Sequence, residues 1–277
     1  MSGGGGSGGG GSSGGRGNSG RGGSGGGDDD GPRAPGFGPE VIVTHDRAAL
    51  AVAVTGIVER AAARAVNARG RFRLALAGGS TPRAIYAAWG GSLGDIAWSR
   101  VDVFFGDERA VPPDDPASNY GMARAAFLDR VGVPAANVRR MEGEAADLDQ
   151  AARDYERGLV AGAAAPWLDL AILGVGPDGH TASLFPGAPA LEERSRLCVA
   201  TSGPEPGSRR LTLTMPVFLE AGAVLFVVAG PEKAAVLGEL LSDAPPTPEL
   251  PAGAVLRRAG SVTLCCDAAA ASALATR

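Results

Sequence analysis

Short apolar runs alternate with longer alanine-rich runs along most of this chain. From residue 40 onward, the β-branched and aromatic runs predict buried strands, and the alanine-rich runs between them predict helices. Strands that alternate with helices are typical of a parallel sheet covered by helices. We therefore predict an α/β fold with a mostly parallel sheet and helices on both of its faces.

Local signals place the individual elements. Asp46 can cap a long helix that Gly70 ends, and Pro82 suits the first turn of another helix because its missing N–H removes no hydrogen bond there. The predicted strands are 41–43, 72–77, 101–105, 168–173, 211–214, 224–228 and 261–265. The predicted helices are 47–68, 82–89, 118–128, 147–160 and 231–241.

The first 39 residues differ from the rest of the chain. They are nearly all Gly and Ser, with a few Arg and the run Asp28-Asp29-Asp30. Such a segment has almost no apolar surface to bury, so nothing offsets the entropy cost of ordering it. We predict a disordered tail over 1–39 and a single α/β domain over 40–277, because no Pro- or Gly-rich break divides the latter.

Composition limits the partners and the compartment. The net charge of −4 gives no broad basic surface, so nucleic acid is not expected as a partner. The longest strongly apolar stretch, 221–229, is too short for a membrane span, and the start lacks the pattern of a signal peptide. The three cysteines lack metal-ligand spacing. We expect a cytoplasmic protein with free thiols, no membrane contact and no obligate protein partner.

Gly78-Gly79-Ser80-Thr81 lies between a predicted strand and a predicted helix. Glycines allow a tight turn whose N–H groups face one concavity, and the helix dipole adds partial positive charge there. This pattern predicts a phosphate-binding loop, although an ordinary tight turn has the same pattern.

Two cations are candidates for the same phosphate. Lys233 is the only lysine in a chain whose other basic residues are all arginine, which hints at a need for a compact point charge. Arg210 directly precedes a predicted strand, and a guanidinium can bind phosphate through two hydrogen bonds. A solvated surface position for Lys233 remains the alternative.

Only two histidines are present. His45 lies at a helix start far from any glycine-rich loop and is read as a surface residue. His180 follows a predicted core strand, is surrounded by glycines, and has Asp178 two residues before it. A carboxylate so near can orient the imidazole and raise its basicity, as in general-base sites. The alternative is a histidine that only bonds to the loop backbone.

Asp107-Glu108-Arg109 stands at the end of another predicted strand. The two carboxylates could bind a metal or exchange protons, or Arg109 could neutralise them in a structural ion pair. We favour a substrate role for Arg109 and a place for Asp107 in the substrate site. Neither Ser80 nor Ser183 lies in a nucleophile elbow, and a zinc site would need ligands that the chain lacks, so no metal and no cofactor is expected.

Together these motifs resemble those of the 6-phosphogluconolactonases. The resemblance covers about 40–270 and rests on five motifs in the family's order: Gly78 to Pro82, Gly106 to Arg109, Gly176 to Phe185, Arg210 to Thr214, and Gly230 to Lys233. It implies a Rossmann-like fold shared with glucosamine-6-phosphate deaminases and ribose-5-phosphate isomerases. It also implies hydrolysis of 6-phospho-D-glucono-1,5-lactone in the pentose phosphate pathway, without a cofactor.

Two other functions stay open at this stage. An amino-sugar-phosphate isomerase or deaminase would share the fold, but the resembling deaminases have a glutamate where this chain has Phe185 and a tyrosine where it has Arg109. A non-catalytic sugar-phosphate sensor would normally carry a DNA-binding segment, and here a glycine-rich tail occupies that place. The chain also lacks the family's usual tryptophan near the last strand, outside the predicted site.

Overall fold

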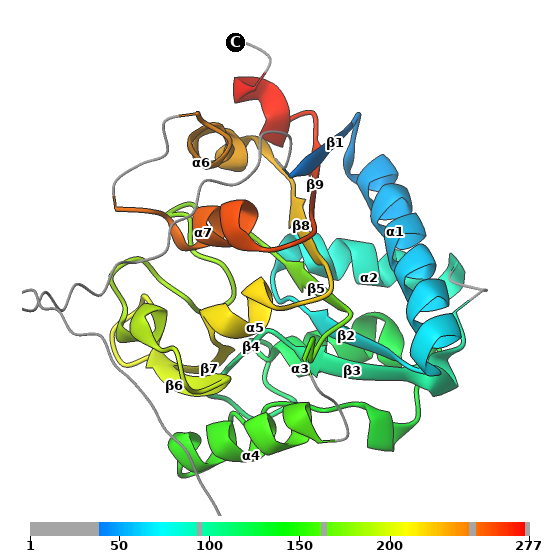
Figure 1. The fold of residues 1–277 in the computed structure, drawn as a ribbon, viewed down its shortest axis with the longest axis vertical. Helices are drawn as coiled ribbons and strands as arrows, with labels where there is room; N and C mark the ends of the chain where they lie inside the picture. The colour runs from blue at the N-terminus through cyan, green and yellow to red at the C-terminus, as the bar shows by residue number, and fades with distance from the viewer. Residues whose placement is uncertain (1–38, 93–95, 162–164, 244–247, 275–277) are drawn as a thin grey trace, which may run out of the picture. The chain divides into compact units, whose positions relative to one another are not determined.

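The described part of the molecule is one α/β unit built on a parallel sheet. The computed structural model describes residues 39–92, 96–161, 165–243 and 248–274, which belong to one compact unit. Within these residues the main sheet has six parallel strands in the order β1-β9-β8-β5-β2-β3 (Figure 1). They are β1 (Glu40–Thr44), β2 (Phe72–Leu76), β3 (Val101–Phe105), β5 (Leu170–Leu173), β8 (Val224–Val228) and β9 (Val262–Asp267). The predicted fold class is confirmed, and the predicted tail lies outside the described residues except for Pro39.

A second, three-stranded antiparallel sheet was not predicted. Its order is β4-β7-β6, with β4 (Asp107–Arg109), β7 (Arg209–Leu213) and β6 (Cys198–Ser202). The prediction for 211–214 was right as a strand, but the strand pairs with β4 and β6 and not with the parallel sheet. Gly106 separates β3 from β4, so the chain leaves the main sheet and enters the small one at that residue.

Helices cover both faces of the main sheet, as predicted. They are α1 (Arg47–Arg69), α2 (Ser80–Ser92), α3 (Asn119–Ala123), α4 (Leu148–Val160), α5 (Met215–Leu219), α6 (Ala234–Leu240) and α7 (Pro251–Arg258). The Asp46 side chain accepts from the N–H of Ala49 at 2.8 Å, and Gly70 ends α1 with φ of 77°. The predicted cap at Asp46 and the predicted helix end at Gly70 are therefore both confirmed.

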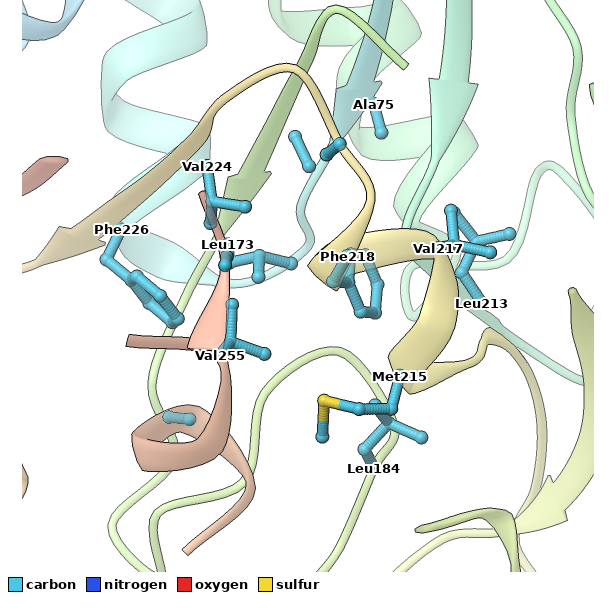
Figure 2. Close-up of a cluster of buried hydrophobic side chains, with 14 of the residues drawn as sticks. Ala75, Leu173, Leu184, Leu213, Met215, Val217, Phe218, Val224, Phe226 and Val255 are labelled. Atoms are coloured by element: carbon cyan, nitrogen blue, oxygen red, sulfur yellow. The ribbon is translucent and has the colours of Figure 1, made fainter. Parts of the chain in front are cut away.

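Two hydrophobic cores lie on opposite faces of the sheet. Along β8, Val224, Phe226 and Val228 pack into the core that includes α5 and α7, while Leu225 and Val227 pack into the core with α1 and α2. This alternation follows from the two-residue period of a strand. Figure 2 shows the first core, where Phe218 of α5 and Val255 of α7 lie near Leu173. Burial on both faces explains why these strands are continuous apolar runs.

Several predicted helices are shorter or differently wound. Helix 118–128 divides into α3 and a π-helical turn at Arg124–Leu128, and helix 231–241 begins with the 3-10 turn Pro231–Lys233. Helix α2 starts at Ser80, two residues before Pro82. Helices α5 and α7 were not predicted, because each is too short for a clear helical period.

Candidate active site

The predicted site residues gather at one cavity. Its volume is about 220 Å³, and it lies where β2, β3, β5 and β8 end. The carboxyl ends of parallel strands meet at one edge of a sheet, which is where open α/β sheets bind ligands. All the predicted residues except Asp178 line it: Gly78, Gly79, Ser80, Thr81, Asp107, Arg109, His180, Arg210 and Lys233.

The glycine-rich loop forms one wall of this cavity. Gly79 has φ of 102°, a conformation that favours glycine. A Cβ on Gly78 would come within 1.9 Å of Oδ1 of Asn119, so that position must also be glycine. The N–H groups of Ser80 and Thr81 open helix α2, where backbone donors lack intrahelical acceptors. The loop therefore has the donors and the dipole that a phosphate group needs.

His180, which lines the cavity, is in direct contact with Asp178. Nδ1 of His180 lies 2.5 Å from Oδ1 of Asp178, and the imidazole is 27 % exposed. Burial raises the pKa of Asp178, but the hydrogen bond and charge of His180 lower it more, so the pKa of this carboxyl lies below its usual range. An ionised carboxylate at Nδ1 favours the tautomer whose Nε2 lone pair can accept a proton.

Gly176 makes room for this pair. A Cβ there would lie 2.0 Å from Nδ1 of His180 and 2.6 Å from Oδ1 of Asp178. The N–H of Gly176 also donates to the carbonyl of His180 at 2.8 Å, which closes the loop. Glycine at 176 is thus a packing requirement of the histidine–aspartate pair.

Phe185 contacts both the histidine and an arginine. Its ring centroid is 4.5 Å from that of His180, and the guanidinium of Arg210 lies 5.7 Å from the same centroid. Phe185 is 9 % exposed. The aromatic ring therefore packs against the imidazole and offers the guanidinium a cation–π contact.

Arg109 and Arg210 are neighbours across the small sheet. They are directly opposite each other in the register of β4 and β7. Like charges in that arrangement repel, and the Nε atoms of both are buried without a hydrogen-bond partner among the described residues. Nη1 of Arg109 donates to the carbonyl of Ala117 at 2.5 Å, and Nη2 of Arg210 lies 3.5 Å from the exposed Glu205 carboxylate. The pair is suited to an anion in the cavity.

The two carboxylates of the Asp107-Glu108 pair have different partners. Glu108 is buried and accepts from the N–H groups of Arg109, Asn119 and Tyr120 at 2.7–2.8 Å, so it caps the start of α3. Burial raises its pKa, and the backbone donors partly offset this. The sequence allowed a structural ion pair between Arg109 and one of these acids. Within the described residues, Arg109 forms no ion pair with Asp107 or Glu108. Glu108 is therefore structural, and Asp107 alone lines the cavity.

Lys233 reaches the cavity from the turn after β8. Gly230 begins that turn with φ of 101°, and the N–H of Lys233 donates to its carbonyl at 3.1 Å. The carboxylate of Asp267, at the end of β9, accepts from the N–H of Gly230 at 3.0 Å. Asp267 therefore anchors the turn that carries the lysine.

Sequence reasoning missed three buried polar residues that support the site. Ser183 donates to Oδ2 of Asp107 at 2.6 Å, Asn119 donates to the Asp107 carbonyl at 2.8 Å, and Asp267 holds the lysine turn. Asp267 follows the same rule as the other site residues, since it stands at the carboxyl end of a strand. The predicted strand stopped two residues before it.

Neither a metal cluster nor a membrane span occurs in the described part of the chain. Within 39–92, 96–161, 165–243 and 248–274, no three His, Cys, Asp or Glu side chains are grouped as a metal site would require. In the same residues no helix has the length and apolar character needed to cross a bilayer.

Known proteins are similar along most of the chain. The family model described as glucosamine-6-phosphate isomerases/6-phosphogluconolactonase matches residues 45–264. A 6-phosphogluconolactonase of Synechocystis is 44% identical over 184 residues (65% of this chain, 75% of the relative), and the human one is 41% identical over 230 residues (79% and 86%). The solved 6-phosphogluconolactonase of Trypanosoma brucei superposes with a TM-score of 0.76 at 26% identity, covering 86% of this chain and 99% of that one. This chain therefore belongs to the glucosamine-6-phosphate isomerase/6-phosphogluconolactonase family.

Proposed function

We propose that this protein hydrolyses 6-phospho-D-glucono-1,5-lactone to 6-phospho-D-gluconate, the lactonase step of the pentose phosphate pathway. The observation that carries the proposal is the shared cavity. One cavity holds a histidine paired with a carboxylate and a separate group of phosphate-binding donors. Relatives with that printed activity are 44% and 41% identical to this chain.

Substrate binding follows from the positive groups around the cavity. The phosphate binds to the loop donors of Ser80 and Thr81, with Arg210 and Lys233 supplying charge. This anchors the lactone ring over the strand ends with its carbonyl carbon near His180. Holding the ring in one orientation removes part of the entropy cost of attack by water.

Water is the nucleophile in the proposed reaction. Nε2 of His180 takes a proton from water as its oxygen bonds to the lactone carbonyl carbon. Arg109, or the loop N–H groups, stabilises the oxyanion of the tetrahedral intermediate. The bond from that carbon to the ring oxygen then breaks, and the imidazolium returns its proton to the ring oxygen. One water is added in total, and the new carboxylic acid ionises in solution.

Asp178 acts through the histidine and does not touch the reacting atoms. Its carboxylate stays ionised, orients the imidazole through Nδ1 and stabilises the imidazolium that forms during the reaction. Asp107 is buried and bonded to Ser183, and we propose that it contacts the sugar hydroxyls. The mechanism proposed for these residues uses no metal and no cofactor.

The deaminase alternative is less suited to this cavity. Ring opening and isomerisation of an amino-sugar phosphate need a further acid or base, and the ring of Phe185 occupies the space beside His180. A non-catalytic sensor would bind the sugar phosphate but would not turn it over. Release of 6-phosphogluconate from fresh lactone therefore distinguishes a lactonase from a sensor. Products formed from glucosamine 6-phosphate would reveal a deaminase.

The histidine is tested by His180→Ala on fresh lactone, after subtraction of spontaneous hydrolysis. Because general acid–base catalysis contributes about 10²–10⁴-fold, we expect kcat to fall by at least about 10². A variant that keeps more than about a third of the wild-type kcat shows that His180 is not the base. His45→Ala is the matched control, since His45 lies on the surface beside Asp46.

The phosphate site is tested separately by Lys233→Ala. The variant is expected to bind 6-phosphogluconate about tenfold more weakly, since a charge-assisted hydrogen bond contributes about 1.5–3 kcal/mol. Binding of unphosphorylated gluconate should not change. Equal losses for both ligands would remove Lys233 from the phosphate role.

We also propose that the protein works in the cytoplasm, which its three free, buried cysteines support.

A further inference from the structure

A second cavity lies at the other end of the main sheet. It has a volume of about 700 Å³ and lies around the amino-terminal starts of β2, β3 and β5, whereas the catalytic cavity is at their carboxyl ends. The charged side chains that line it are four arginines and two aspartates: Arg69, Arg71, Arg73, Arg139, Asp102 and Asp169. The cavity is therefore locally basic in a chain whose net charge is −4.

Both carboxylates are already bonded to other groups of this cluster. Asp102 accepts from Nε of Arg71 at 2.6 Å and from a second guanidinium nitrogen of the same residue. Asp169 accepts from Nη2 of Arg69 and, at 2.8 Å, from the backbone N–H of Arg73. The guanidinium groups of Arg73 and Arg139 have no ion pair among the described residues.

Arg73 is the inner cation of the cavity. Its guanidinium lies 4.8 Å from the ring centroid of Phe104, and its Nη2 donates to the carbonyl of Leu159 at 2.5 Å. Its Nη1 is buried and has no hydrogen-bond partner among the described residues. Burial lowers the pKa of Arg73 although Asp102 and Asp169 act in the opposite direction. A buried donor on a charged group costs free energy unless an acceptor is bound to it.

Arg139 is the outer cation. It is exposed and lines the cavity, and its backbone N–H donates to the carbonyl of Val103 in the middle of β3. Arg139 and Arg73 line the same cavity, together with Asn137, and the charge of Arg139 acts to lower the pKa of Arg73. Two like charges on one cavity favour a bound anion that offsets them.

We infer that this cavity is a second anion site, bound by Arg73 and Arg139 and separate from the catalytic cavity, and that its ligand is the phosphate group of a small metabolite. Phosphate fits because its oxygens accept paired hydrogen bonds from a guanidinium. The cavity volume limits the ligand to a small molecule. A ligand at this end of the sheet would not compete directly with the lactone.

The test is calorimetric titration with inorganic pyrophosphate in an Arg210→Ala/Lys233→Ala background. That background removes two cations of the catalytic cavity, and the effect of Arg139→Gln on the remaining binding reports on the second cavity. We expect one pyrophosphate per chain, and about tenfold weaker binding when Arg139→Gln is added, as for the loss of one charged hydrogen bond. A parallel titration with glycerol 1-phosphate distinguishes esterified from free phosphate, and binding of either that Arg139→Gln weakens supports the site.

Arg100→Gln is the matched control. Arg100 is exposed at the same end of the sheet and donates to the carbonyl of Gly70, but it does not line the cavity. The inference is overturned if neither phosphate compound binds in the background, or if Arg139→Gln and Arg100→Gln weaken binding equally. Because Arg139 is exposed, its substitution should leave the fold intact, and unchanged thermal unfolding would verify this.

Discussion

Gly176→Ala is expected to separate catalysis from substrate binding. The new methyl group would lie 2.0 Å from Nδ1 and 2.2 Å from Cε1 of His180, whereas ordinary contact begins at 3.4 Å. The imidazole must therefore move by about 1 Å or more, and a displacement of that size can cost about 10²-fold in rate. The backbone of Gly176 is not in the left-handed region, so alanine adds no conformational strain.

The assay is the initial rate on fresh lactone, together with calorimetric affinity for 6-phosphogluconate. We expect kcat to fall about 10²-fold, with affinity for the product within about threefold of wild type, because the substitution leaves the proposed phosphate-binding residues unchanged. Gly158→Ala is the control, since a Cβ there would meet no atom within 4 Å and the residue lies on α4, outside the catalytic cavity. The reasoning is refuted if Gly176→Ala keeps a third of kcat, or if both variants lose activity equally.

Three further variants test other parts of the site. Asp178→Asn removes the charge that stabilises the imidazolium, so kcat on fresh lactone should fall at least about tenfold while affinity for 6-phosphogluconate stays within about threefold; an equal loss in both would contradict this. Glu108→Ala leaves two N–H groups at the start of α3, and that of Arg109 in β4, without their acceptor. The free energy of unfolding should therefore fall by about 3 kcal/mol or more, against about 1 kcal/mol for the exposed cap Asp46→Ala; equal losses in urea titrations would reject the difference. Ser183→Ala removes the hydroxyl that donates to the Asp107 carboxylate at 2.6 Å. KM should rise severalfold, while the midpoint of thermal unfolding shifts by only a few degrees. An unchanged KM would show that this hydrogen bond does not position Asp107.

Much of the fold could be predicted from local patterns. The strands of the main sheet are apolar because both faces are buried, and the long helix α1 begins and ends at a cap that the sequence displays. The small antiparallel sheet was missed because β4 has three residues and β6 carries partly buried residues without a clear apolar run. Short strands are defined by their partners, and these partners are distant in the sequence.

Most of the residues at the cavity were predicted because they follow a strand. His180, Asp107 and the Gly78-Gly79 loop are at the carboxyl ends of β5, β3 and β2, and parallel strands bring those ends together. Arg210 is different, since it reaches the cavity through its pairing with Arg109 in the small sheet. That proximity depends on a register of two antiparallel strands, which the sequence does not display.

The sequence by itself determined the fold class, the glycine-rich loop before α2 and the histidine–aspartate pair, because each depends on local patterns of residues along the chain. Only the tertiary structure decided which partner each charged side chain has. In the fold, Glu108 accepts from the N–H groups at the start of α3, and Asp107 accepts from Ser183. Arg73 and Arg139 line one cavity at the amino-terminal end of the sheet. The physical reason is that a buried charge is stabilised by whatever donor or acceptor the packed chain brings within about 3 Å, and that partner can come from any distance along the sequence.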